Sequence, residues 1–197
     1  DYIRAIKNIA TKPRITFEVN ARPREEVQRY KDAGADHIHF NMEVWDKTLF
    51  PWINPGKAER VGWDNWVRWM EDAVEVFGNG MVQPSFVSGV EMARPHGFKT
   101  VEEAVKSTTS GFEYLMSRGI LPRPQQWRRE PSTALCKEAE QPPVPLDYYI
   151  LMTRTWYELY QKYREKLPRF GTRKPGLLAE RNLLGPVHGA YGDFAMV

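Results

Sequence analysis

The stretch Asp36-His37-Ile38-His39-Phe40-Asn41-Met42-Glu43 decides the fold class, because apolar and polar side chains alternate along it. Successive side chains of a β-strand point to opposite faces, so Ile38, Phe40 and Met42 would share one face and the polar residues the other. A parallel strand covered by helices on both faces is usually apolar on both. The alternation therefore predicts that one face packs on helices while the polar face lines a barrel interior. A partly exposed open sheet is the alternative.

Three more strand-like runs and five helical patterns extend this unit along the chain. The runs are Ile15–Asn20, Met81–Val90 and Ile120–Arg128, and the helical patterns are Tyr2–Ile9, Arg24–Ala33, Asp64–Phe77, Val101–Arg118 and Leu146–Lys166. Thr100 is the expected N-cap of the helix that Gly119 ends. Strands that alternate with helices of this length indicate right-handed βαβ units and a parallel sheet. We therefore expect an α/β fold, a partial parallel β/α barrel of the TIM type with about four strand–helix units, over residues 1–168. An irregular stretch around Pro51, Pro55 and Gly56 interrupts it, and an irregular tail covers 169–197.

Composition excludes several classes of protein. The 197 residues suit one domain, 42% are hydrophobic, and the net charge of +3 comes from Lys and Arg interleaved with Asp and Glu, so no nucleic acid partner is expected. No apolar run approaches the roughly 18 residues of a membrane span, so no membrane partner is expected either. Cys136 is the only cysteine, which rules out an internal disulfide and favours the cytoplasm. No Met opens the chain, and we expect its natural N-terminus to lie elsewhere.

Polar residues gather where the expected strands end, which is where barrels of this kind place their sites. Carboxylates, amides and guanidinium groups in one place suit a ligand with hydroxyls, an ammonium group and a carboxylate. The residues that arrive there are Glu18, Asn20, Asn41, Glu43, Ser88, Glu91, Arg128 and Arg129.

Three stretches, in this order, resemble the radical S-adenosylmethionine (radical SAM) enzymes, nearest to biotin synthase and lipoyl synthase. Phe40-Asn41-Met42-Glu43 is similar to the end of the family's fourth strand, where an Asn and an acidic residue hold the cofactor ribose. Ser88-Gly89-Val90-Glu91 is similar to the Gly-x-x-Glu ending of the fifth strand, with Ser88 in place of the usual glycine. Glu130-Pro131-Ser132-Thr133-Ala134-Leu135 resembles the turn near the adenine.

The resemblance implies a set of cofactor contacts. Asn41 and Glu43 would bind the ribose, and charge-assisted hydrogen bonds from its hydroxyls to a carboxylate are among the stronger ones. Lys57 or Arg60 would bind the methionyl carboxylate, with a plain surface charge as the alternative for each, and a solvated loop carboxylate is the alternative for Glu43. The remaining cofactor contacts implied are Ser88 and Glu91 beside the cofactor, and Arg129 and Pro131 near the adenine.

Residues on the polar strand faces are candidates for binding the substrate. Glu18 could instead form a buried ion pair with Arg123, and Trp127 could serve core packing. No catalytic residue and no metal ligand is assigned. The substrate-binding candidates are Glu18, Asn20, His39, Gln125 and Trp127.

The family's Cys-x3-Cys-x2-Cys loop is missing from this sequence, and one cysteine cannot ligate a four-iron cluster. The resemblance therefore implies the C-terminal, SAM- and substrate-contacting part of an oxidoreductase or transferase that uses a 5′-deoxyadenosyl radical to abstract hydrogen. Its 4Fe-4S cluster would be held by a cysteine-bearing N-terminal barrel segment or subunit. A reductant such as flavodoxin or ferredoxin and a small-molecule substrate are the other expected partners, and a homo-oligomer is a further possibility. Cys136 is either a hydrogen donor, a contact to a second cluster, or an ordinary thiol.

Two other classes compete with this interpretation. His37 and His39 share one strand face at a spacing that lets two imidazoles reach one metal, with Glu18 or Glu91 completing a hydrolase site. The second alternative is a non-catalytic binding or scaffold module that keeps the barrel shape without the cluster. Bound zinc or manganese would favour the hydrolase, and cofactor binding without turnover would favour the scaffold.

Overall fold

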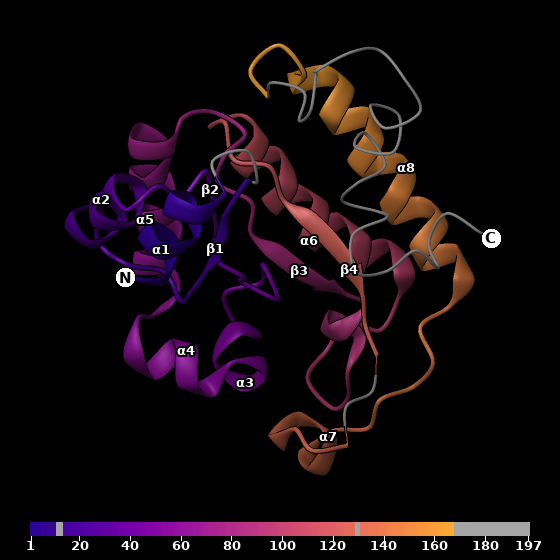
Figure 1. The fold of residues 1–197 in the computed structure, drawn as a ribbon. Coiled ribbons are helices and arrows are strands. Elements are labelled where there is room, and N and C mark those ends of the chain that lie inside the picture. Colours follow the sequence, from indigo (N-terminus) through magenta and orange to yellow (C-terminus); the bar gives the residue numbers. More distant parts are fainter. Residues whose placement is uncertain (11–13, 129–130, 168–197) are drawn as a thin grey trace.

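Parallel β-strands alternate with helices in the computed structural model, which describes residues 1–10, 14–128 and 131–167 (Figure 1). The strands are β1 (Thr16–Glu18), β2 (His37–His39), β3 (Ser85–Ser88) and β4 (Arg123–Gln126). The long helices are α1 (Tyr2–Ile9), α2 (Arg24–Asp32), α5 (Trp63–Phe77), α6 (Val101–Met116) and α8 (Leu146–Tyr163). The predicted α/β alternation is confirmed, and every expected helix is present with ends that differ by a few residues. Among the helices of these ranges, none combines the length and apolar character that a membrane crossing requires.

The strands lie in the order in which they occur in the chain. β1 pairs with β2 and β3 pairs with β4, both in parallel, and two isolated parallel bridges, Ile38 to Val82 and Glu43 to Phe86, connect the two pairs. In the described residues the strands form an open row, so closure into a barrel remains a prediction.

Helices cover one face of this row, as the alternation predicted. Ile38 and Phe40 are fully buried, Phe17 of β1 contacts Tyr30 of α2 with ring centroids 4.4 Å apart, and Phe86 of β3 contacts Phe112 of α6 at 5.1 Å. The side chains between these residues in sequence therefore point to the other face, which we call the inner face. The inner face carries Glu18, His37, His39, Asn41, Ser85, Arg123 and Gln125.

Short helices follow the strands at the end where the site was expected. They are α3 (Phe50–Ile53), α4 (Pro55–Arg60), the 3-10 turn η1 (Val90–Met92) and α7 (Ala134–Glu138). Figure 1 shows α3, α4 and α7 together at the lower end of the molecule. The prediction of an irregular stretch around Pro51 and Pro55 was wrong, because both prolines occupy the first turn of a helix, where the missing N–H has no intrahelical partner to lose.

The Thr100 N-cap is confirmed, since its side chain accepts a hydrogen bond from the Glu103 N–H at 3.2 Å. This cap fixes the start of α6, whose buried side packs behind β3.

The chain that follows β2 packs tightly on α6 at Gly111. A Cβ at this position would lie 2.3 Å from the Trp45 indole. Alanine in place of a helical glycine ordinarily adds about 0.5–1 kcal/mol of stability. Here we expect Gly111→Ala to lower the free energy of unfolding by about 1–3 kcal/mol, because the indole must move. Urea denaturation beside Ser110→Ala, an exposed position on the same helix, measures the difference, and a stabilised Gly111→Ala would contradict this packing.

Candidate functional site

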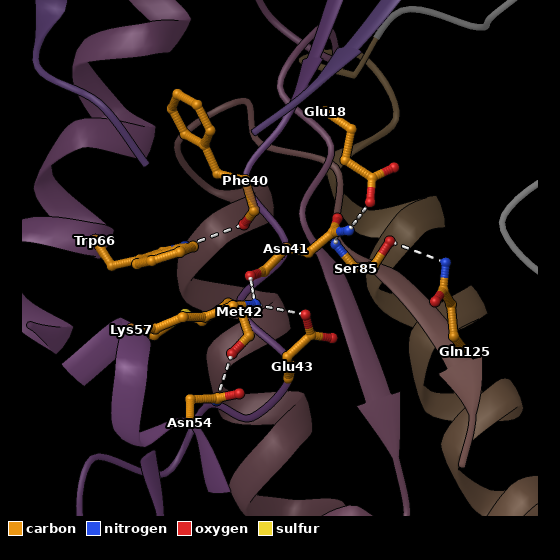
Figure 2. A network of polar contacts seen from close by, with 10 residues as sticks. All are labelled: Glu18, Phe40, Asn41, Met42, Glu43, Asn54, Lys57, Trp66, Ser85 and Gln125. Atoms are coloured by element: carbon orange, nitrogen blue, oxygen red, sulfur yellow. Dashed lines mark hydrogen bonds and ion pairs between the residues drawn. The ribbon is translucent and has the colours of Figure 1, made fainter. Parts of the chain in front are cut away.

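The chain just beyond β2 is held by side chains from the helical segment that follows it (Figure 2). Three consecutive backbone carbonyls each accept a hydrogen bond from a different side chain, and we call the three donor residues the carbonyl clamp. The pairs are Trp66 Nε1 to Phe40 O at 3.1 Å, Lys57 Nζ to Asn41 O at 2.6 Å, and Asn54 Nδ2 to Met42 O at 3.2 Å. Because these carbonyls are bonded to side chains, regular β2 ends at His39 although the alternating pattern continues to Met42.

Asn41 connects three strands through its side-chain amide. Its Oδ1 accepts a hydrogen bond from the Ser85 N–H of β3 at 3.1 Å, and its Nδ2 donates to Glu18 Oε1 of β1 at 2.6 Å. Gln125 of β4 donates to Ser85 Oγ at 2.9 Å, which extends the polar network across the inner face (Figure 2). The structure thus brings together Glu18, Asn41 and Gln125, which the sequence placed at one site.

Glu43 is the one non-glycine residue with positive φ in the described part of the chain, at 67°. An ordinary side chain in this left-handed conformation costs about 1–2 kcal/mol, and such strain is concentrated at functional sites. The Glu43 carboxylate accepts a hydrogen bond from Lys57 Nζ at 2.5 Å, and the two side chains are 24% and 22% exposed. The strained residue therefore presents a partly accessible, charge-paired carboxylate at the strand ends.

His37 and His39 lie buried on the inner face. Burial, with the nearby charge of Arg14, lowers the pKa of His37 to about 4, and burial with the charge of Arg123 lowers the pKa of His39 to about 3. Both imidazoles are therefore neutral at pH 7. Arg123 Nη1 lies 3.4 Å from His39 Nδ1, which suits a neutral ring whose Nδ1 accepts a hydrogen bond from the guanidinium.

The hydrolase alternative needs further metal ligands near these imidazoles. Within residues 1–10, 14–128 and 131–167, no group of three or more His, Cys, Asp or Glu side chains is placed so that it could hold a metal ion. The two-histidine spacing alone therefore does not support a metal centre.

Ser88 and Glu91 lie behind the sheet, on the side that the helices cover. Glu91 is 2% exposed, and its carboxylate accepts hydrogen bonds from Tyr148 Oη at 2.5 Å, Thr108 Oγ1 at 2.6 Å and the Gly89 N–H at 2.8 Å. Burial raises the pKa of Glu91 and, together with the Glu91 charge, raises that of Tyr148 well above its usual value. We call Glu91 and its three partners, Gly89, Thr108 and Tyr148, the Glu91 cluster. The hydrogen-bond partners of Glu91 lie at Gly89, on α6 and on α8. The predicted contacts of Ser88 and Glu91 with a cofactor remain predictions.

The remaining predicted residues lie around the strand ends. Asn20 is half-buried just after β1, Arg60 is exposed at the end of α4, Trp127 is partly buried just after β4, and Pro131 is exposed before α7. Cys136 is a partly buried free thiol within α7. Arg129, the Glu130 start of the adenine-type turn, and the tail 169–197 lie outside the described residues.

Sequence reasoning missed Thr108 and Tyr148 as partners of Glu91 and missed the pairing of Lys57 with Glu43. A signal for the first was present, since Thr108 and Tyr148 are hydroxyl residues within amphipathic helical patterns and Glu91 lies between Val90 and Met92. No spacing rule connects residues 14 positions apart with the helix α3 between them, as Glu43 and Lys57 are.

Comparison with known proteins gives a distant match. No family model matches the chain. The chain is 24% identical over 155 residues to a bacteriochlorophyllide c C-7(1)-hydroxylase from Chlorobaculum limnaeum, and the alignment covers 77% of this chain and 35% of that protein. The chain thus corresponds to about a third of the hydroxylase, and at this identity the match establishes a distant, partial similarity.

Proposed function

We propose that this chain is the C-terminal, S-adenosylmethionine- and substrate-contacting part of a radical SAM enzyme. The observation that carries the proposal is Glu43, a strained carboxylate held at the carboxyl end of a parallel strand beside Asn41 and Lys57. Asn41 and Glu43 are two positions of the motif on which the resemblance to radical SAM enzymes rests. Lys57 is a cation that donates hydrogen bonds to both residues.

The distant relative supports the same kind of chemistry. A hydroxylase replaces a C–H bond by a C–O bond, and removal of a hydrogen atom from carbon is the step that the radical SAM resemblance implies. The substrate of this chain is a small molecule that has a C–H bond to be broken. Its candidate contacts are Glu18, Asn20, His39, Gln125 and Trp127.

The described residues fit the nucleoside part of the cofactor. Glu43 offers a carboxylate acceptor to the vicinal hydroxyls, and Asn41 keeps this part of the chain aligned with β1 and β3. Pro131 and Arg129 would lie towards the adenine, and Ser88 and Glu91 would support the turn beside the cofactor. When bound and reduced, the cofactor supplies the 5′-deoxyadenosyl radical, while the protein positions the reactants and excludes water.

The chain does not fit the iron–sulfur cluster. Cys136 is its only cysteine, and such a cluster needs several thiolates. The cluster would belong to a cysteine-bearing segment or subunit, with a flavodoxin- or ferredoxin-type reductant as electron source. A non-catalytic module that binds the cofactor without turnover is the second candidate.

Equilibrium dialysis with labelled S-adenosylmethionine tests the cofactor site. We expect the wild-type chain to bind it, and Glu43→Gln to weaken binding about tenfold or more, which corresponds to about 1.4 kcal/mol, because a charged acceptor becomes a neutral amide. Glu59→Gln, an exposed carboxylate on α4, is the matched control and should bind like the wild type. Failure of the wild-type chain to bind, or equal binding by Glu43→Gln, would contradict the proposed site.

A second measurement separates the two candidate functions. The native complex, purified without oxygen and supplied with S-adenosylmethionine and a reductant, should release methionine and 5′-deoxyadenosine if the chain is part of a radical enzyme. Cofactor binding without 5′-deoxyadenosine, with the cysteine-bearing segment present, would establish the binding module instead.

A further inference from the structure

We infer that Lys57 is a positioning residue that holds the Glu43 carboxylate in place for the ribose, and that it does not bind the methionyl carboxylate of the cofactor. This inference rests on the proposed function. It replaces the contact with the methionyl carboxylate that the resemblance assigned to Lys57. It also makes ribose binding depend on Lys57 as well as on Glu43.

The hydrogen-bonding capacity of Lys57 is almost fully used within the protein. An ammonium group has three N–H donors and accepts no hydrogen bonds. One donor meets the Asn41 carbonyl at 2.6 Å, one meets Glu43 Oε1 at 2.5 Å, and Nζ also lies 5.2 Å from the centroid of the Trp66 ring. Only one N–H is left for an incoming carboxylate, and the Trp66 ring lies on one side of the ammonium group, so Lys57 is a poor candidate for a direct contact.

The backbone of Glu43 is fixed separately, by β3. Its N–H donates to the Ser85 carbonyl at 3.0 Å, and its own carbonyl accepts from the Val87 N–H at 2.8 Å. With the main chain held in the left-handed conformation by the sheet, the side chain still has rotamers to choose from. The bond to Lys57 selects one of them, so both ends of the residue are fixed before a ligand arrives. Pre-organisation of this kind raises affinity because less freedom is lost on binding.

A matched control exists in the same part of the chain. Lys47 Nζ pairs with Asp64 Oδ1 at 2.7 Å and lies 5.3 Å from the Trp63 ring centroid, so it shares the ion pair and the ring contact of Lys57 but not the bond to a backbone carbonyl. The Lys47 and Asp64 side chains are 61% and 75% exposed, and neither takes part in the network around Glu43. Lys47→Met therefore removes a comparable ion pair and ring contact without touching the site.

The first experiment compares two probes on the full chain by calorimetry. Adenosine carries the ribose and the base, whereas S-adenosylmethionine also carries the methionyl carboxylate. If Lys57 positions Glu43, Lys57→Met weakens the binding of both probes by the same factor, which we expect to be about tenfold, and Lys47→Met changes neither. Weaker binding of S-adenosylmethionine with unchanged binding of adenosine would overturn the inference, because that is the signature of a direct carboxylate ligand.

A double-mutant cycle gives an independent readout. If Lys57 acts through Glu43, Lys57→Met has little further effect on binding once Glu43→Gln is present. An undiminished effect in the Glu43→Gln background would show that Lys57 acts on the ligand directly. Lys57→Arg keeps the charge and two or more donors, and it should recover part of the affinity that Lys57→Met loses.

Backbone NMR of the ligand-free protein separates this inference from the proposed function. Lys57→Met should shift the amide signals of Glu43 and Val44, whereas Lys47→Met should leave them unchanged. If Lys57→Met shows these shifts but the wild type binds no nucleoside, the pairing of Lys57 with Glu43 stands and the proposed cofactor site is refuted. Unchanged Glu43 signals in a folded Lys57→Met protein would refute the positioning role itself.

Discussion

Between pH 6.5 and pH 4.5 the protein should lose stability through two buried histidines. The pKa values of His37 and His39 fall from 6.5 to about 4 and about 3 on folding, so in this range the unfolded chain binds protons that the folded chain does not. A group with a depressed folded pKa favours unfolding as the pH falls below its unfolded pKa. Each histidine then removes up to about 1.4 kcal/mol of unfolding free energy per pH unit. The effect is absent above the unfolded pKa, where both imidazoles are neutral in either state.

Urea unfolding of the wild type and of His37→Gln/His39→Gln at a series of pH values measures this effect. The difference between the two proteins is the useful quantity, because Glu91 titrates with the opposite sign. Its raised pKa makes the folded state hold a proton longer, so Glu91 adds stability as the pH falls. We expect the stability advantage of the wild type to shrink by about 2–2.5 kcal/mol per pH unit between about pH 6 and pH 5, for two histidines together. A difference that does not change with pH would show that the imidazoles are protonated, or solvated, in the folded state.

Removal of the Glu91 carboxylate should be the most destabilising single change in the described core. Glu91→Ala leaves the hydroxyls of Thr108 and Tyr148 and the Gly89 N–H without their acceptor, in a place where Glu91 and Tyr148 are at most 2% exposed. Each buried donor left without a partner costs about 1–3 kcal/mol, and we expect a total loss of about 3–5 kcal/mol of unfolding free energy. The loss is large because the cluster joins the end of β3 to both α6 and α8.

Graded variants test whether the loss comes from the hydrogen bonds. Tyr148→Phe removes one donor and leaves two, so it should cost about 1–2 kcal/mol. Glu59→Ala, at an exposed position, should cost less than about 0.5 kcal/mol. Chemical denaturation of the three variants gives the order directly, and a Glu91→Ala protein as stable as Glu59→Ala would show that the cluster contributes nothing.

The part of the fold that periodicity controls could be predicted from the sequence. The alternation in Asp36–Glu43 assigned Ile38 and Phe40 to the helix-covered face and His37 and His39 to the other, and the structure places them so. Local rules also succeeded at Thr100, because a cap depends on a residue three positions away.

What failed were features that depend on contacts distant in sequence. The strand stops at His39 because its next carbonyls meet side chains 12 to 26 residues further along the chain. Glu91 looks like a strand-end ligand until Tyr148, 57 residues later, is seen to donate to it. Alternation and capping rules do not apply across such separations. The sequence therefore predicted which polar residues lie at the strand ends, but not which residues they bond to.

The carbonyl clamp makes unequal demands on the residues it joins. Every amino acid supplies the same backbone carbonyl, so the identities of residues 40 and 42 are free to vary with the packing around them. The donors have no such freedom, because an indole N–H, an ammonium and an amide at positions 66, 57 and 54 each come from one or two side-chain types. Among natural variants of this protein, substitutions should therefore accumulate at residues 40 and 42 and be rare at the three donor positions of the clamp. The three donor residues, which lie on the helical segment after β2, would then identify this site in a sequence more specifically than residues 40 and 42 do.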